Sequence, residues 1–357
     1  MTSLSDLPLR DSLRGREPYG APQLHVPIAL NVNENTHPLS EGVIEDIVSS
    51  VQAAAKTINR YPGREFTALR QALASYLGHG LAENQIWAAN GSNEILQQMF
   101  QAFGGPGRKA LGFRPTYSMY SIIASGTDTA YLDADRGERF ELTPELVSAA
   151  IREHGPDIVL LCSPNNPTGT PLSLDCIKAA YEATEGMVVV DEAYAEFSSA
   201  DSAISLLPGR PRLVISRTMS KAFAFAGARV GYLAADPAVV DAMRLVRLPY
   251  HLSAFTQAAA EAALRHSAVL LGAVEDIRKQ RDRLLVELKK LGFDPYASDS
   301  NFVLFGGVSD PEKTFTELLA RGVLVRNVGL PNTLRVTAGT EAETTAFLAA
   351  LAELQAN

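Results

Sequence analysis

The order of strand-like and helix-like segments predicts an α/β protein. Its larger part is expected to be a mostly parallel sheet with helices on both faces. Between residue 85 and about residue 235, short apolar runs alternate with amphipathic stretches, which is typical of parallel sheets. The run 187–190 is apolar throughout, as strands buried on both faces are. After residue 246, strand-like runs and helices form a separate block, which predicts a smaller α+β domain.

The length of 357 residues fits two domains of roughly 150 residues each, preceded by an arm. Residues 1–37 are rich in Arg and Pro with little periodicity, so we expect an N-terminal arm that packs on the small domain and on a partner subunit. Residues 38–245 are the expected large domain, and residues 246–357 the expected small domain. Apolar positions from residue 258 to 288 predict one long connecting helix.

The composition excludes several classes of protein. A hydrophobic content of 46% and a charged content of 20% are those of a soluble globular protein. The net charge of −8 argues against nucleic acid or an anionic membrane as the main partner. Two cysteines without CxxC spacing indicate neither a disulfide framework nor a metal site. The first 16 residues lack the apolar core of a signal peptide, so a cytoplasmic location is expected.

The segment from residue 218 to 231 connects two strand-like runs and places Lys221 directly after the first of them. Ligands bind beyond strand ends in such sheets, and a lysine amine in a dry pocket can form a Schiff base. Thr218, Ser220 and Arg229 are suited to hold a phosphate nearby. Taken alone, a Ser-Lys pair is more often an ordinary exposed lysine. The remaining strand ends decide between the two interpretations.

Two earlier segments offer further groups for a cofactor. Ser92 and Asn93 follow a strand and a glycine and begin a helix, which makes an anion cradle from backbone N–H groups. The same pattern also serves as a plain helix start. Tyr117 follows the next strand and can stack on a flat ring, although a core or rim position is the commoner role of such a tyrosine.

The next two strand ends complete a set that suits pyridoxal phosphate. Asp191 ends an apolar strand and can keep a pyridinium nitrogen protonated, although it can also cap the following helix. Asn166, aimed by the proline after it, and Tyr194 can hydrogen-bond the phenolic oxygen of the cofactor. Each group has an ordinary structural alternative. The order of these residues along the chain and their chemical types together match what this one cofactor needs.

At this point the chain resembles a known family over nearly its whole length. It is similar to the class I and II, fold-type I pyridoxal-phosphate aminotransferases, and within them most similar to the histidinol-phosphate aminotransferase family. The motifs that carry this resemblance, in order, are Gly91-Ser92-Asn93-Glu94, Pro164-Asn165-Asn166-Pro167-Thr168-Gly169, Asp191-Glu192-Ala193-Tyr194, Ser220-Lys221, Gly227-Ala228-Arg229-Val230-Gly231 and Leu334-Arg335-Val336-Thr337.

The resemblance implies roles for the cofactor site. Lys221 would be the Schiff-base lysine and proton shuttle, Asp191 the partner of the ring nitrogen and Tyr117 the stacking residue. Tyr194 would be the third catalytic residue, together with Lys221 and Asp191. Tyr61 would reach the cofactor phosphate of the neighbouring subunit, so a homodimer with shared active sites is implied.

The resemblance also implies a substrate site. Arg335 resembles the residue that receives the α-carboxylate of glutamate or 2-oxoglutarate. Arg326, together with Tyr19 and Arg335, resembles the group that receives the substrate phosphate. Asn33 is a further candidate for substrate binding by the same resemblance, and Tyr250 is a weaker candidate at the same wall. Two departures from the family pattern occur at Thr36, where proline is usual, and at Ala228.

The implied reaction is a transamination in histidine biosynthesis. It interconverts L-histidinol phosphate plus 2-oxoglutarate with imidazole acetol phosphate plus L-glutamate. Three alternatives stay open: a related aminotransferase that acts on aromatic or other 2-oxo acids, a phosphothreonine-type decarboxylase of the same fold, and a binding protein without catalysis.

Overall fold

The computed structural model describes residues 3–16, 20 and 23–356. Its centre is a seven-stranded sheet with the order β2-β8-β7-β6-β5-β3-β4. The strands are β2 (Ile86–Ala89), β3 (Lys109–Arg114), β4 (Ala130–Asp135), β5 (Ile158–Cys162), β6 (Met187–Asp191), β7 (Leu213–Thr218) and β8 (Gly231–Ala235). Within this sheet β8 is antiparallel to both of its neighbours, and the other pairs are parallel. The predicted mostly parallel α/β fold is therefore confirmed.

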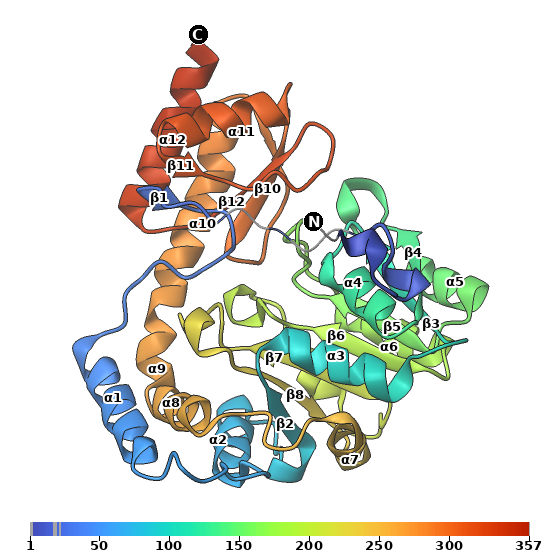
Figure 1. Ribbon diagram of the computed structural model, residues 1–357. Coiled ribbons are helices and arrows are strands. Elements are labelled where there is room, and N and C mark those ends of the chain that lie inside the picture. The colour runs from blue at the N-terminus through green and yellow to red at the C-terminus, as the bar shows by residue number, and fades with distance from the viewer. Residues whose placement is uncertain (1–2, 17–19, 21–22, 357) are drawn as a thin grey trace.

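Helices cover this sheet because each has one apolar stripe that must be buried. Helix α3 packs with α4 and α7, whereas α5 packs with α6, and these two groups flank the sheet (Figure 1). Strands β5, β6, β7 and β8 are buried along their whole length. The helices of this part are α1 (Glu41–Ala55), α2 (Thr67–Leu77), α3 (Ser92–Phe103), α4 (Met119–Gly126), α5 (Pro144–His154), α6 (Leu174–Ala183) and α7 (Pro237–Val246).

The C-terminal part contains a three-stranded antiparallel sheet of order β12-β10-β9. Its elements are β9 (Asp294–Pro295), β10 (Phe302–Gly306), β12 (Leu334–Thr337), α11 (Pro311–Ala320) and α12 (Glu341–Ala356). The short strand β1 (Ile28–Ala29) comes from the other end of the chain and pairs in parallel with β11 (Val323–Leu324). The loop after β1 is therefore held beside the C-terminal sheet, as Figure 1 also shows.

The predicted single helix from residue 258 to 288 is wrong. The structure has three helices there, α8 (Ala254–Arg265), α9 (Ser267–Leu270) and α10 (Gly272–Lys290). His266 leaves the helical region with φ −106° and ψ 19°, and Gly272 has the low helix propensity that allows a new start. Helix α8 packs on α1 and α2, so the break redirects the chain.

Short 3-10 helices complete the elements: Leu4–Asp6, Asp11–Leu13, Glu83–Gln85, Glu138–Phe140, Ala195–Phe197, Ala203–Leu206 and Ala226–Ala228. In the described part of the chain, no helix combines the length and the hydropathy needed to cross a bilayer. The division into an arm and two domains at residues 37 and 245 stays a prediction.

Candidate active site

A cavity of about 520 Å³ lies at the carboxyl ends of β5, β6 and β7. Each of these strands places a residue on its wall, respectively Cys162, Asp191 and Thr218. The start of α3, the loop after β1 and two arginines from the C-terminal part also contribute to the wall. Parallel strands aligned at one edge bring these distant segments together, which is why the switch region of such sheets binds ligands.

Asp191 is buried in this wall and has one satisfied and one unsatisfied oxygen. The hydroxyl of Tyr120 donates a hydrogen bond of 2.9 Å to Oδ2. Oδ1 has no hydrogen-bond partner among the described residues. Burial raises the pKa of Asp191 to about 6, and the Tyr120 hydrogen bond opposes this rise. An N–H donor from a ligand would satisfy Oδ1 and favour the ionised carboxylate.

Lys221 lies just beyond β7, half-buried, and its Nζ donates a hydrogen bond of 2.9 Å to the carbonyl of Val32. Burial lowers the pKa of Lys221 to about 8, and the nearby charge of Arg335 acts in the same direction. An amine with this pKa is partly neutral near pH 8, so it can act as a nucleophile and accept a proton.

The start of α3 meets the Lys221 segment in a compact polar cradle. The Ser220 N–H donates to Thr218 Oγ1 at 3.1 Å, and Arg229 Nη1 donates to Ser220 Oγ at 3.3 Å. Glycine is required on both sides of the contact: a Cβ on Gly91 would lie 2.2 Å from Arg229 Nη2, and one on Gly231 would lie 2.1 Å from the Ser92 nitrogen. Backbone N–H groups, hydroxyls and a guanidinium make this cradle suited to a phosphate.

Tyr194 is buried between two amides on the opposite side of the cavity. The side-chain amide of Asn33 donates to its hydroxyl oxygen at 2.9 Å, and that of Asn166 approaches the same oxygen at 3.5 Å. Burial raises the pKa of Tyr194 to about 12, so the phenol is neutral at physiological pH. Its hydroxyl hydrogen can therefore be donated to a ligand oxygen.

Arg326 and Arg335 bring two guanidinium groups to one wall. They are cross-strand neighbours whose backbone N–H and C=O groups bond each other at 2.9 Å. Arg335 is buried, lies 4.9 Å from the centre of the Phe302 ring and donates from Nη2 to the carbonyl of Asn31 at 2.8 Å. Two fixed guanidinium groups form a second anion site in the same cavity.

Most of the side chains predicted from the sequence line this one cavity. They are Asn33, Ser92, Asn93, Tyr117, Asn166, Asp191, Tyr194, Thr218, Ser220, Lys221, Arg229, Arg326 and Arg335. Tyr61 and Tyr250 do not line it: their rings stack on each other with centroids 4.4 Å apart, and Tyr61 is 80% exposed. Tyr19 lies outside the described residues. The roles assigned to all these residues stay predictions.

Several residues of the site were missed in the sequence. Tyr120 follows Tyr117 by three residues, and this helical spacing was a usable signal for a second tyrosine on the same face. Glu34 lines the cavity although only its neighbour Asn33 had been assigned a role. Thr36, the departure from the family pattern, donates from Oγ1 to Glu343 Oε2 at 2.7 Å and so ties the cavity loop to α12.

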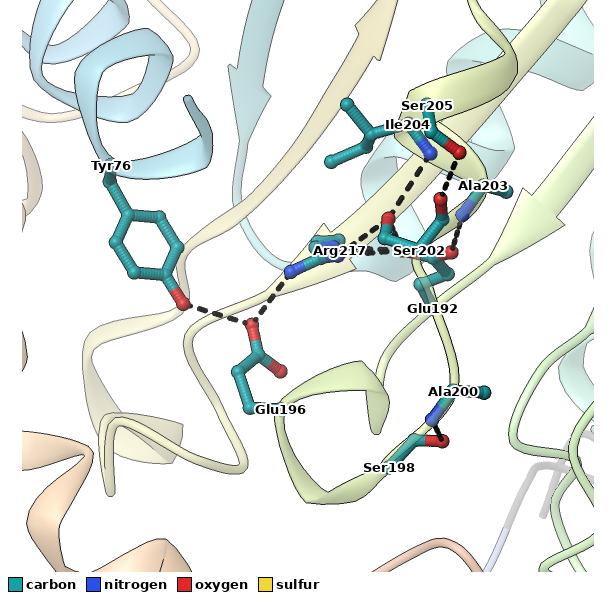
Figure 2. A network of polar contacts seen from close by, with 10 residues as sticks. All are labelled: Tyr76, Glu192, Glu196, Ser198, Ala200, Ser202, Ala203, Ile204, Ser205 and Arg217. Carbon is teal, nitrogen blue, oxygen red and sulfur yellow. Dashed lines mark hydrogen bonds and ion pairs between the residues drawn. The ribbon is translucent and has the colours of Figure 1, made fainter. Parts of the chain in front are cut away.

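A buried ion cluster adjoins the site and was also missed (Figure 2). Arg217, next to Thr218, donates from Nη2 to Glu192 Oε2 at 2.8 Å and from Nη1 to Glu196 Oε1 at 3.3 Å. The Tyr76 hydroxyl of α2 donates to Glu196 Oε1 at 3.2 Å. Each carboxylate here faces donors from the protein itself, and the cluster is separate from the cavity wall.

The residues present fit pyridoxal phosphate. The unsatisfied Oδ1 of Asp191 can accept from a ring nitrogen, the cradle around Ser220 can hold a phosphate, and Lys221 supplies an amine to the same cavity. Tyr194 and Asn166 present polar hydrogens to a ring oxygen.

Comparison with known proteins agrees with this geometry. The family described as aminotransferase class I and II matches residues 26–351. The chain is 63% identical to the histidinol-phosphate aminotransferase of Paenarthrobacter aurescens (strain TC1), over 98% of this chain and 96% of that protein. It is 59% identical to the protein of the same name from Frankia casuarinae, over 97% and 89% respectively. The solved histidinol-phosphate aminotransferase of Sinorhizobium meliloti in complex with pyridoxal-5'-phosphate shares the fold, with a TM-score of 0.82, 24% identity and coverage of 93% of this chain and 91% of that one.

Proposed function

Because the chain belongs to the class I and II aminotransferase family, we propose that it interconverts imidazole acetol phosphate plus L-glutamate with L-histidinol phosphate plus 2-oxoglutarate. Glutamate is the amino donor in the direction of histidine biosynthesis, and histidinol phosphate is the amino donor when the reaction runs in reverse. The structural observation that carries the proposal is that one cavity holds two anion sites, the cradle at Ser220 and the pair Arg326 and Arg335. A phosphorylated cofactor and a phosphorylated amino donor need two such sites.

The cofactor is pyridoxal phosphate. When bound, it supplies an aldehyde that takes up an amino group and a ring that withdraws electrons from the substrate carbon. Asp191 holds the proton on the ring nitrogen through Oδ1, and Tyr120 fixes the position of that carboxylate. Thr218, Ser220 and Arg229, with the first N–H groups of α3, hold the phosphate.

Lys221 performs the proton transfer. Lys221 lines the cavity just beyond β7, where its Nζ donates to the Val32 carbonyl at 2.9 Å, and its lowered pKa makes the neutral amine accessible. As a neutral amine, Nζ of Lys221 would accept a proton from the substrate carbon and then give it up again within the same cavity. Tyr194, held by Asn33, donates to the phenolic oxygen and completes the positioning.

Arg335 and Arg326 select the substrate. The guanidinium of Arg335 is oriented by the Asn31 carbonyl and by Asn166, so it can form a paired hydrogen bond with a carboxylate. Arg326 beside it adds the second cation that a phosphate dianion requires. One wall thus serves glutamate in one half-reaction and histidinol phosphate in the other.

The assembly we propose is a homodimer with shared active sites. Exposed apolar side chains surround the stacked pair of Tyr61 and Tyr250: Leu245 is 86% exposed and Leu248 is 74% exposed. A partner copy would cover this surface and receive Tyr61 at its cofactor phosphate. We place the N-terminal arm, residues 1–37, at the same interface and against the small domain, 246–357, beside the large domain, 38–245. The free, buried Cys162 and Cys176 are compatible with the reducing cytoplasm.

The test is a single-turnover reaction of the purified, cofactor-loaded enzyme with histidinol phosphate, phenylalanine and glutamate in turn. The spectrum of the bound cofactor reports each amino transfer. We expect histidinol phosphate to give the highest kcat/KM among the donors and glutamate to convert the cofactor to the same aminated form. A preference for phenylalanine, or release of carbon dioxide from phosphothreonine, would replace the proposal by a related aminotransferase or by a decarboxylase.

A further inference from the structure

Glu34 is the charged residue of the cavity for which the proposed function has no use. Among the described residues that line the cavity, the carboxylates are Asp191 and Glu34. Asp191 is buried at the end of β6 and faces Tyr120. Glu34 instead lies on the loop after β1 and is exposed. Its charge is close enough to Lys221 to favour the protonated amine.

The loop holds Glu34 firmly at the cavity. Asn33, with a left-handed φ of 59°, has its N–H bonded to Thr337 Oγ1 at 3.1 Å and its carbonyl bonded to Asn301 Nδ2 at 3.0 Å. On the other side, the Asn35 amide donates to the Ala222 carbonyl at 3.2 Å. Both neighbours of Glu34 are thus fixed by hydrogen bonds, and Glu34 between them lines the cavity.

The carboxylate itself is left available. Within the described part of the chain, no hydrogen bond or ion pair involves the Glu34 side chain, in contrast to the bonded residues on either side of it. A fixed loop that presents an unpaired carboxylate to a cavity is arranged to receive a donor from a ligand.

The charges of the cavity indicate which part of the ligand this is. Lys221, Arg229, Arg326 and Arg335 are cations that serve the anionic groups. The proposed amino donor has one further polar end, an imidazole ring with an N–H donor. A carboxylate is the acceptor that such a ring needs, and it binds the protonated ring more tightly still.

We propose that the Glu34 carboxylate accepts a hydrogen bond from the imidazole N–H of the amino donor and is thereby a specificity-determining residue. The inference rests on the proposed function, because it assigns the ring of that donor to one side chain. It predicts that the enzyme discriminates imidazole from a phenyl ring through Glu34. A site built to bond an N–H group rejects analogues that lack it.

The experiment compares Glu34→Ala and Glu34→Gln with the unmodified, cofactor-loaded enzyme. For Glu34→Ala we expect KM for histidinol phosphate to rise about 10-fold with kcat little changed, because an exposed charge-assisted hydrogen bond is lost. Glu34→Gln keeps an acceptor oxygen without the charge and should recover part of the loss. Phenylalanine and glutamate have no imidazole, so their KM should stay within about twofold, and any change in kcat that comes through the charge on Lys221 should be the same for all three donors.

The control is Glu153→Ala, the same change at an exposed glutamate of α5 that lines no part of the cavity. It should leave all three donors unaffected. An unchanged KM for histidinol phosphate in Glu34→Ala, or an equal rise in KM with all three donors, would overturn the assignment. If the unmodified enzyme does not use histidinol phosphate at all, the proposed function itself fails, which is a separate outcome.

Discussion

Two adjacent carboxylates at the end of β6 have opposite surroundings. Asp191 lines the cavity, and its Oδ1 has no partner in the described structure. Glu192 is buried in the ion cluster, where Oε2 accepts from Arg217 and Ser202 and Oε1 accepts from the Ala203 N–H at 2.7 Å (Figure 2). A buried polar atom left without a partner is costly. The comparison teaches that the carboxylate of the ion cluster takes all its hydrogen bonds from the protein, whereas the carboxylate of the cavity keeps one oxygen that a ligand can satisfy.

The neighbouring strand β7 repeats the pattern. Thr218 and Lys221 face the cavity, while Arg217 points into the ion cluster. Burial opposes the charge of Arg217, but Glu196 and Glu192 together outweigh it and raise its pKa above the ordinary value. The cluster thus joins the ends of β6 and β7 from outside the cavity. Its expected contribution is to stability, whereas the contribution of Asp191 and Lys221 is to function.

The largest effect is expected at Lys221. In the proposed function Lys221 both binds the cofactor covalently and carries the proton, so Lys221→Ala should lower turnover by at least about 10³-fold. The visible absorbance of the lysine-bound cofactor should vanish as well. Lys178→Ala is a matched control, because Lys178 pairs with Asp175 on the surface of α6. If Lys221→Ala kept both its turnover and its absorbance, the functional role proposed for Lys221 would be wrong.

The variant Arg217→Ala tests whether the buried ion cluster stabilises the fold. Arg217→Ala leaves Glu192 and Glu196 buried without their cation, and breaking such a pair costs about 3–5 kcal/mol of the free energy of unfolding. Urea denaturation measures this loss. The control Arg108→Ala breaks the exposed pair with Asp157 and should cost about 0–1 kcal/mol. Equal losses of unfolding free energy in the two variants would mean that the buried ion pairs stabilise the fold no more than an exposed pair does.

Asp191→Asn should separate function from stability. The amide keeps the shape of the carboxyl group but cannot hold the ring nitrogen protonated, so kcat should fall about 10²-fold. The cofactor-free protein should gain stability at pH 7. The pKa of Asp191 is raised from 3.8 to about 6 in the fold, so the carboxyl destabilises the protein progressively as pH rises between these two values and by a constant amount at higher pH. Unfolding curves at pH 4 and pH 7 measure this: a gain in stability at pH 4 alone would contradict the linkage.

The cavity residues could be predicted from the sequence far better than the residues of the ion cluster. The sheet and the positions of Asp191 and Lys221 could be predicted because apolar runs mark buried strands and the residues that follow them mark strand ends. Arg217 gave no such signal, since its partner Glu196 comes from another segment and only the tertiary fold brings them together. The helix break at His266 was missed because the apolar pattern continues through it.

The smallest effect distinguishes two tyrosines that each donate to a carboxylate. Tyr120 bonds Asp191 and Tyr76 bonds Glu196. Tyr120→Phe removes a donor that lowers the pKa of Asp191, so the acid side of the activity profile should move to higher pH and kcat/KM should fall about 10-fold. Tyr76→Phe should leave the profile in place, because Glu196 touches no part of the cavity. A shift of the same size in both variants would show that the ion cluster and the cavity behave as one electrostatic unit.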